Sequence, residues 1–477
     1  MKATRGPSLE AVFLAALVLR AMAWVFLLPP WAGFDEAFHQ SYALDQAERL
    51  RWPGFGGVTL REDVAREVRR WTLLEENRRL AAGVPNYETQ QSPLYYWASG
   101  LCLRALPGLE PLPGLYLLRL GNAALLLASA VLTARAARRL FAGSAWLPVA
   151  YLALLPGLGV ALCRVSNDAL ATLLISIAVA ATLPEVSARF AAAGALAAGL
   201  SPWAKLYGLA SIPGSVLAAL RGRSRVLRLG LAVLPAIALL SLSRVVLGRI
   251  FPLQENLVKG SDAGLLEVPW WKDLWSLAKT HVFVAGVPSL VFPKPVYLIA
   301  LAALAFAAIR TLGCWRREGS TLVFLAMPLV LFVLSLLYHA WRSYSAVREP
   351  GGTGGWYFWS MLLPESLFMT WGLARRPAPA RWRTPALAFF VALTAAGDAI
   401  LLGLPSNSLV VRGQEVFGFR APSLAAIGEG LVASRPPVVA ALAVAFTLGS
   451  WALLLAGTLL SSRAATDDPS RRTGSPA

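Results

Sequence analysis

The chain has 477 residues, of which 57% are hydrophobic and only 15% are charged. Its mean hydropathy is +0.58. Soluble domains are about half apolar and about a quarter charged, so this composition excludes a water-soluble globular protein. The formal charge of +18 does not indicate nucleic acid binding, because the arginines gather at the ends of apolar runs. There they anchor helices against anionic lipid head groups.

Long apolar runs recur along the whole chain, and ~20 such residues cross a bilayer core of ~30 Å. Backbone amides in hydrocarbon must be satisfied within the segment, so runs rich in Leu and Ala indicate helices rather than a barrel. The sequence therefore predicts an all-α polytopic membrane protein. Its first run follows a short basic start and lacks a small-residue cleavage site before Pro29-Pro30. This pattern is typical of a retained signal anchor.

Short basic segments between the runs are expected in the cytoplasm by the positive-inside rule. This rule predicts about twelve to thirteen transmembrane helices, with both termini inside. Residues 93–107 are apolar but short and contain Arg104, so we expect a re-entrant or interfacial segment there. The predicted spans are 9–29, 113–133, 143–163, 167–184, 188–202, 204–220, 226–247, 295–312, 320–338, 356–375, 385–404 and 437–460.

We expect one transmembrane domain over residues 1–460, followed by a disordered cytoplasmic tail at 461–477 that is rich in Ser, Thr, Pro, Asp and Arg. Two external loops are long, 30–92 and 248–294. The three cysteines, Cys102, Cys163 and Cys314, are too widely spaced for a disulfide framework or a C-x-x-C metal site. They are expected to be packing residues.

The first external loop opens with an acidic pair, Asp35-Glu36, a few residues beyond the first span. Asp35 can cap a helix that lies on the membrane, on which Asp35 and His39 would share one face. Helix capping and the helix dipole would by themselves explain the pair. The apolar side of this helix would comprise Phe38, Tyr42 and Leu50.

The rest of this loop contains a second amphipathic stretch and an aromatic end. Residues 60–80 place acids and arginines at helical spacing, which predicts a solvated surface helix. The loop closes with Tyr87-Glu88-Thr89-Gln90-Gln91-Ser92-Pro93-Leu94-Tyr95-Tyr96-Trp97, in which polar groups precede aromatic side chains suited to the membrane interface.

An Asp-Glu pair just after the first span, followed by a polar stretch that leads into Pro-Leu-Tyr-Tyr-Trp, resembles the GT-C superfamily of integral-membrane glycosyltransferases. The likeness is greatest to members of the protein mannosyltransferase and aminoarabinose transferase type. Arg164-Val165-Ser166-Asn167-Asp168-Ala169-Leu170 is similar to the Asn-Asp-Ala-Leu segment of that superfamily, and Ser201-Pro202-Trp203-Ala204-Lys205 to its Lys-bearing turn. The segment from Gly355 to Pro364 resembles a Gly-Arg-Tyr…Pro segment, with Trp356 in place of arginine. Ser92 likewise replaces a usual proline.

The resemblance implies transfer of a sugar from a polyprenyl phosphate donor to an acceptor hydroxyl at the external leaflet, with inversion. Asp35 is then expected to be the general base, with Glu36 beside it to orient the base or the acceptor. Lys205, in the family-like turn, is the expected phosphate ligand. The other expected donor-site residues are Asp168, Arg164, His281 and Arg342, and the expected acceptor-side or supporting residues are His39, Glu88, Gln91 and Tyr95.

A divalent metal is a further possibility. All three histidines, His39, His281 and His339, fall on expected external segments together with Asp35, Glu36 and Glu88. No H-x-x-x-H or H-E-x-x-H spacing is present, so the sequence leaves metal binding open.

Two other classes of protein stay open. A secondary transporter would need charged or broken-helix features near the bilayer midplane, and the charged residues there, Arg20, Arg244, Glu365 and Asp398, are scattered along the chain. The second of these classes is a non-catalytic scaffold that kept the fold and lost the activity. The composition is typical of a bacterial-type inner membrane protein, and we expect the site to face the periplasm or exterior.

Overall fold

The computed structural model describes residues 8–54, 57–71, 81–221, 224–248, 263–285, 290–349, 354–376, 380–406, 409–412, 414–419 and 424–466. Helices dominate these ranges, which confirms the predicted class of an all-α polytopic membrane protein. Among the described residues, seven helices are long and apolar enough to cross a membrane. They are α1 (Leu9–Leu27), α6 (Pro111–Leu140), α12 (Arg225–Leu247), α15 (Lys294–Leu312), α16 (Trp315–Val347), α18 (Ala380–Gly403) and α20 (Pro437–Thr466).

Shorter apolar helices occupy the other predicted spans. The span expected at 143–163 is broken into two helices at Leu155-Pro156-Gly157, where proline has no backbone N–H to give to a helix. These helices are α7 (Trp146–Leu154), α8 (Leu158–Leu162), α9 (Asp168–Ala180), α10 (Ala188–Ala204), η3 (Leu206–Ser211) leading into α11 (Ile212–Leu220), and η4 (Gly355–Met361) leading into α17 (Leu362–Arg375).

The remaining elements belong to the loops. In chain order they are α2 (Glu36–Glu48), α3 (Glu62–Trp71), η1 (Tyr87–Gln90), α5 (Leu94–Arg104), η2 (Ala142–Ser144), α14 (Trp270–Val282), η5 (Leu404–Ser406), β1 (Leu409–Arg412), β2 (Glu415–Phe419) and α19 (Leu424–Ala433). The two strands form an antiparallel hairpin in which Leu409 pairs with Phe419 and Arg412 with Glu415.

The bounds of α5 and α20 can be compared with the predictions for residues 93–107 and for the C-terminal tail. Helix α5 has 11 residues and, at 1.5 Å per residue, is ~16 Å long, so it is too short to cross the bilayer, as expected for residues 93–107. The tail was expected to begin at Ser461, but α20 continues to Thr466. Residues 467–477 of the predicted tail, and 72–80 of the predicted surface helix, lie outside the described residues.

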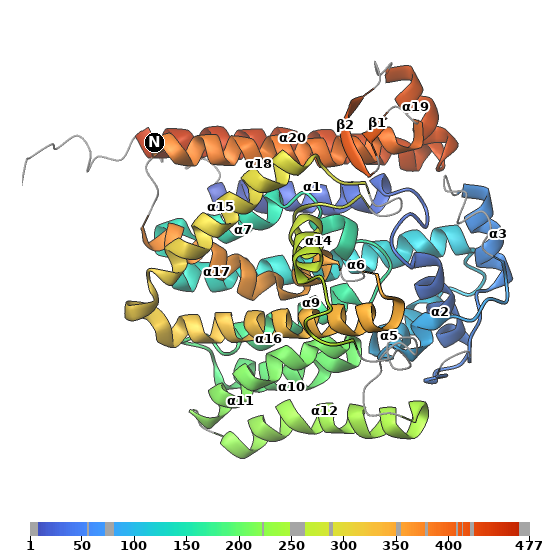
Figure 1. Ribbon diagram of the computed structural model, residues 1–477, viewed down its shortest axis with the longest axis horizontal. Helices are drawn as coiled ribbons and strands as arrows, with labels where there is room; N and C mark the ends of the chain where they lie inside the picture. Colours follow the sequence, from blue (N-terminus) through green and yellow to red (C-terminus); the bar gives the residue numbers. More distant parts are fainter. Residues whose placement is uncertain are drawn as a thin grey trace, which may run out of the picture.

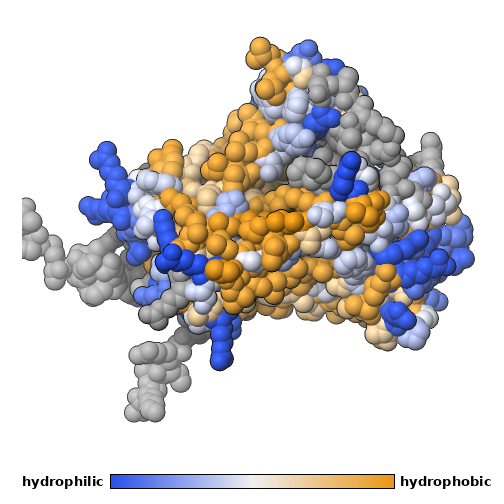
Figure 2. Space-filling model, turned by 90° about the horizontal axis from the view of Figure 1, so that it is seen from below, coloured by the Kyte–Doolittle hydropathy of each residue, from blue (hydrophilic) through white to orange (hydrophobic). Residues whose placement is uncertain are grey.

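The long helices run side by side, with α20, α18 and α1 on one side of the bundle and α12 at the opposite edge (Figure 1). Helices α2, α3 and α5 gather at the end of the bundle away from the N-terminus. Figure 2 shows hydrophobic residues across the middle of one face and hydrophilic residues toward both ends. On α12, for example, Leu234 and Val245 are 64% and 81% exposed. Water-exposed apolar area costs ~25 cal/mol per Å², so this surface suits lipid.

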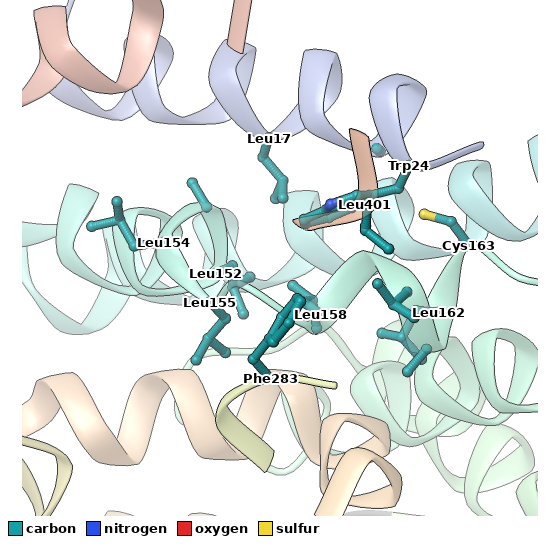
Figure 3. Close-up of a cluster of buried hydrophobic side chains, with 14 of the residues drawn as sticks. Leu17, Trp24, Leu152, Leu154, Leu155, Leu158, Leu162, Cys163, Phe283 and Leu401 are labelled. Carbon is teal, nitrogen blue, oxygen red and sulfur yellow. The ribbon is translucent and has the colours of Figure 1, made fainter. Parts of the chain in front are cut away.

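Helices α1 and α8 pack closely at the centre of the bundle. Leu17 and Trp24 of α1 lie with Leu158, Leu162 and Phe283 in one buried cluster (Figure 3). A Cβ atom on Gly159 of α8 would lie 1.5 Å from the Trp24 ring, so only glycine allows this approach.

Two charged residues that are far apart in the sequence meet within the bundle. Arg20 of α1 and Asp398 of α18 form a buried ion pair at 3.3 Å, and Asp398 also accepts from the indoles of Trp24 and Trp451. Arg20 also donates to the Ala153 carbonyl at 2.7 Å, beside the break between α7 and α8. These contacts join α1 to the break and to α18.

Candidate active site at the loop-one end of the bundle

Helix α2, which was expected to lie on the membrane, folds against the bundle. Most of α2 is buried, because it packs against α5 and places Tyr42 on the Tyr96 ring at a centroid distance of 4.0 Å. The expected position of this helix was therefore wrong. Leu50, which was expected on its apolar side, lies beyond its end and is 49% exposed.

Asp35 occupies an unusual backbone conformation at the start of α2. It is the N-cap residue, but its side chain makes no capping hydrogen bond and its φ is 61°, in the left-handed region. This region costs a non-glycine residue roughly 1 kcal/mol or more, although Asp tolerates it better than most. The carboxylate is exposed, and one oxygen accepts a hydrogen bond from the Tyr87 hydroxyl. Helix capping therefore does not explain Asp35.

Glu36 points the opposite way, into the protein. Its fully buried carboxylate accepts from Nε and Nη2 of Arg119 at 2.9 and 2.6 Å. The backbone N–H groups of Gly33 and Val165 donate to it at 3.0 and 2.9 Å. Gly33 permits this arrangement, since a Cβ atom there would lie 2.5 Å from Cδ of Glu36. Both carboxylate oxygens are engaged, so Glu36 fixes the turn that carries Asp35.

Asp35, His39 and Glu88 form a small cluster whose ligand atoms lie within 4.8 Å of one another. Nδ1 of His39 is 2.7 Å from the Tyr96 hydroxyl and 3.5 Å from Oε2 of Glu88. Burial, and then Arg164 and Lys205, lower the pKa of His39 well below 6.5, so its ring is neutral at pH 7.

Glu88 of this cluster is difficult to ionise. Its side chain is buried in η1, and burial, with the nearby Asp35 charge, raises its pKa to about 8. A divalent cation held by Asp35, His39 and Glu88 would remove this repulsion, and two carboxylates with a neutral imidazole are suitable ligands. The donor set therefore fits the metal that the sequence left open.

A second cluster combines two cations with one carboxylate. Asp168, the first residue of α9, accepts from Nη2 of Arg164 at 3.1 Å and from Nζ of Lys205 at 2.7 Å. The Tyr207 hydroxyl also donates to Asp168, at 2.5 Å. Lys205 is the C-cap residue that follows α10, and its Nζ lies 5.0 Å from the centre of the Tyr357 ring. The three sequence-predicted residues Arg164, Asp168 and Lys205 thus come together, with one positive charge in excess.

The two clusters are adjacent. Nη1 of Arg164 donates to the carbonyl of Phe34, the residue before Asp35, at 2.7 Å. The Phe34 ring stacks on Trp356 of η4 at 4.5 Å, and η4 also carries Tyr357. Trp356, which replaces the usual arginine, therefore helps to join the Asp35 turn to the Lys205 cluster.

The other four predicted residues lie in four different places. Gln91 accepts from Nδ2 of Asn167 at 2.7 Å, beside Asp168, and Tyr95 packs edge-on to Tyr96 under the His39 cluster. His281 instead pairs with Glu365 of α17 at 2.9 Å, in a separate group. Arg342 of α16 lies over the Trp341 ring at 5.4 Å. The structure thus gathers most of the predicted residues, but His281 is held elsewhere.

Sequence reasoning missed Arg119, Tyr87 and Tyr207. Arg119 lies within the predicted span 113–133, and an arginine in such a run signals a buried partner. Tyr87 and Tyr207 carried no comparable signal, because their contacts with Asp35 and Asp168 join segments 52 and 39 residues apart.

Comparison with solved structures finds similar folds. Over 94% of this chain and 77% of the other, the structure aligns with ArnT from Cupriavidus metallidurans bound to undecaprenyl phosphate, at 16% identity and a TM-score of 0.49. The apo state of that protein gives 17% identity and 0.44, with 94% and 76% covered. The archaeal oligosaccharyltransferase AglB from Archaeoglobus fulgidus gives 14% and 0.36, with 91% and 56% covered. No protein-family model and no curated protein matches the chain. ArnT, an aminoarabinose transferase, and AglB are both GT-C glycosyltransferases, the superfamily that the sequence motifs resemble.

Proposed function

We propose that this protein is a glycosyltransferase that moves a sugar from a polyprenyl-phosphate-linked donor to an acceptor hydroxyl, with inversion. The observation that carries the proposal is the exposed Asp35 carboxylate beside the Arg164–Asp168–Lys205 cluster, at one end of an apolar helix bundle. A base and an anion-binding group, side by side, are the two requirements of such a transfer.

Asp35 is the proposed general base. Its carboxylate is exposed and one of its oxygens accepts a hydrogen bond from Tyr87, so the acceptor hydroxyl can approach it from solvent. As the acceptor oxygen bonds to the anomeric carbon from one face, the bond from that carbon to the phosphate oxygen breaks on the opposite face. The acceptor proton passes to Asp35, and the phosphate leaves with the bonding electron pair. A single displacement of this kind inverts the anomeric centre.

Lys205 and Arg164 are proposed to bind the phosphate of the donor and to stabilise its charge as it leaves. The two cations share one carboxylate, Asp168, so a phosphate diester balances the excess charge. Asp168 itself is 2% exposed and is proposed to hold both cations in position. The lipid tail of such a donor would lie along the apolar surface of the bundle.

Glu36 is proposed as the residue that positions Asp35, in line with the orienting role expected from the sequence. Both of its oxygens are engaged by Arg119 and backbone N–H groups. It therefore acts through the turn that aims Asp35. Gln91 would support Asn167, beside Asp168, and Tyr95 would support Tyr96, beside His39. His281 and Arg342 are not part of the proposed site.

Asp35, His39 and Glu88 would hold a divalent metal, which would supply positive charge for the phosphate oxygens when bound. Purified protein equilibrated with Mn²⁺ is expected to retain about one ion per chain, measured by elemental analysis after desalting, and Glu88→Gln to retain much less. Equal metal content in both proteins would remove the metal from the proposal.

We propose that the protein is integral to a bacterial-type inner (plasma) membrane, with this site facing the periplasm or exterior. The basic segments that flank the spans support this orientation. The site would then lie on the side opposite the short basic segments.

The direct test is turnover by the purified full chain in lipid, given a panel of polyprenyl-phosphate-linked sugars and followed by release of polyprenyl phosphate. Asp35→Asn is expected to lower release by at least a hundredfold, since general base catalysis supplies about 10²–10⁴-fold. Asp45→Asn is the matched control, because Asp45 lies on the same helix but pairs with Arg51. It is expected to leave release unchanged.

The same assay separates the alternatives. Absence of release with every donor, from a protein that unfolds cooperatively, would contradict the proposal and favour the transporter or the scaffold. Uptake of labelled solute by vesicles containing the protein would then identify a transporter.

A further inference from the structure

A polar cavity of about 280 Å³ lies apart from the candidate active site, where α14, the start of α15 and the β1–β2 hairpin meet. The hairpin is fixed there by backbone hydrogen bonds. The N–H of Val291 donates to Gln414, and that of Val416 donates to Val291, both at 2.9 Å. The polar and aromatic side chains in its wall are those of Trp275, Lys279, Tyr297, Arg412, Gln414 and Glu415.

The cations in this wall outnumber the carboxylates. Among the described residues, neither Lys279 nor Arg412 forms an ion pair, and the only carboxylate in the wall is that of Glu415. A third cation, Lys294, lies 5.8 Å from the centre of the Trp275 ring. The cavity therefore has an excess of positive charge, together with one acceptor group.

The neighbouring surface is that of a membrane interface. On α14, Trp271 and Leu274 are 68% and 50% exposed, next to Lys272. Exposed tryptophan beside lysine is typical of the head-group level of a bilayer. The hairpin lies toward the same end of the bundle as α2 (Figure 1). An amphipathic molecule in the membrane can thus present its head group to the cavity.

We infer that this cavity binds the phosphate of a lipid head group whose alcohol carries a hydroxyl or an ammonium group. Lys279 and Arg412 donate to the phosphate oxygens as charge-assisted hydrogen bonds. Glu415 accepts from the hydroxyl or ammonium group, and Trp275 offers it an aromatic face. The inference does not depend on the proposed activity.

The cavity is connected to the candidate site indirectly, through α14 and η4. Thr280, the residue after Lys279, accepts from the N–H of Gly355 at 2.7 Å, and Gly355 begins η4. Tyr357 of η4 contacts Lys205. A head group bound at Lys279 would thus lie against α14, which contacts η4, and η4 contacts Lys205 of the candidate site.

Native mass spectrometry of the detergent-solubilised full chain tests the inference. Phosphatidylglycerol and phosphatidylethanolamine are expected to bind at a saturable site, and diacylglycerol, which lacks the phosphate, is not. The double variant K279Q/R412Q is expected to bind both phospholipids at least tenfold more weakly. K272Q, on the same helix but exposed, is the matched control and should change binding less than twofold. Unchanged melting temperatures establish that the variants are folded.

Two further arms define the ligand. E415Q is expected to weaken binding of phosphatidylglycerol several-fold and to leave phosphatidic acid, which lacks the alcohol, unaffected. Glycerol 3-phosphate that binds as tightly as the lipid would assign the cavity to a soluble phosphate ester. Equal binding by wild type and K279Q/R412Q, or an equal loss in K272Q, would overturn the inference.

Discussion

Asp35 and Glu36 are adjacent in the sequence, yet the structure predicts opposite effects when each is replaced by its amide. Asp35→Asn should remove turnover and leave the free energy of unfolding almost unchanged. Glu36→Gln should lower the free energy of unfolding by several kcal/mol. The reason is that the first carboxylate is exposed and the second is fully buried against Arg119.

The size of the second effect follows from the contacts of Glu36. Its carboxylate accepts two hydrogen bonds from Arg119 and one each from Gly33 and Val165. An amide would keep one acceptor oxygen, but its NH2 group would face N–H donors, and the buried Arg119 charge would lose its counter-ion and keep only neutral partners such as the backbone carbonyls. Breaking a buried ion pair from one side costs about 3–5 kcal/mol. Asp35→Asn keeps an oxygen for Tyr87, so its expected effect is within about 0.5 kcal/mol.

The assay is thermal and denaturant unfolding of each variant in one detergent, run beside the donor-release measurement. The double variant Glu36→Gln/Arg119→Met should recover part of the lost stability, because it removes both charges. A Glu36→Gln protein as stable as wild type would refute the buried-pair argument. An Asp35→Asn protein destabilised by several kcal/mol would refute the separation of roles.

Three further predictions concern the rest of the bundle. Lys205→Met should weaken binding of polyprenyl phosphate by about 10- to 150-fold in a lipid-binding titration, since a charged hydrogen bond contributes about 1.5–3 kcal/mol; unchanged affinity would exclude Lys205 as the phosphate ligand. Asp398→Leu should lower the free energy of unfolding by about 3–5 kcal/mol, and adding Arg20→Met should restore much of it. No recovery of stability would contradict the attribution of this loss to the unpaired Arg20 charge. Gly355→Ala should lower both melting temperature and turnover, because its Cβ would lie 1.8 Å from a backbone carbonyl of α14; Gly121→Ala, with open space around it, is the control.

The fold class could be predicted from the sequence because it depends on local properties. Hydropathy and charge along the chain indicated the apolar helices, and each of the twelve predicted spans overlaps a helix or a helix pair. Local patterning failed where contacts decided the outcome. Helix α2 looked amphipathic and was expected on the membrane, but Tyr42 and its neighbours are buried against α5.

The candidate site could be predicted only in part. The sequence by itself singled out Asp35, Arg164, Asp168 and Lys205, because acids and cations at the ends of apolar runs stand out and match family motifs. It could not show which of two adjacent carboxylates is exposed. Their difference depends on Arg119, 83 residues away from Glu36 in the chain.

Tertiary packing alone decided how these residues meet. Helices α2, α9 and α10, with η4, bring the Asp35 turn to the Lys205 cluster through the Arg164–Phe34 and Phe34–Trp356 contacts. Such pairings leave no pattern in a single sequence. A buried charge in a low-dielectric interior needs a partner, and that partner can come from any distance along the chain. The sequence thus determined the membrane-embedded helices and the residue types available for chemistry, and the packing of distant segments determined which of them share one site.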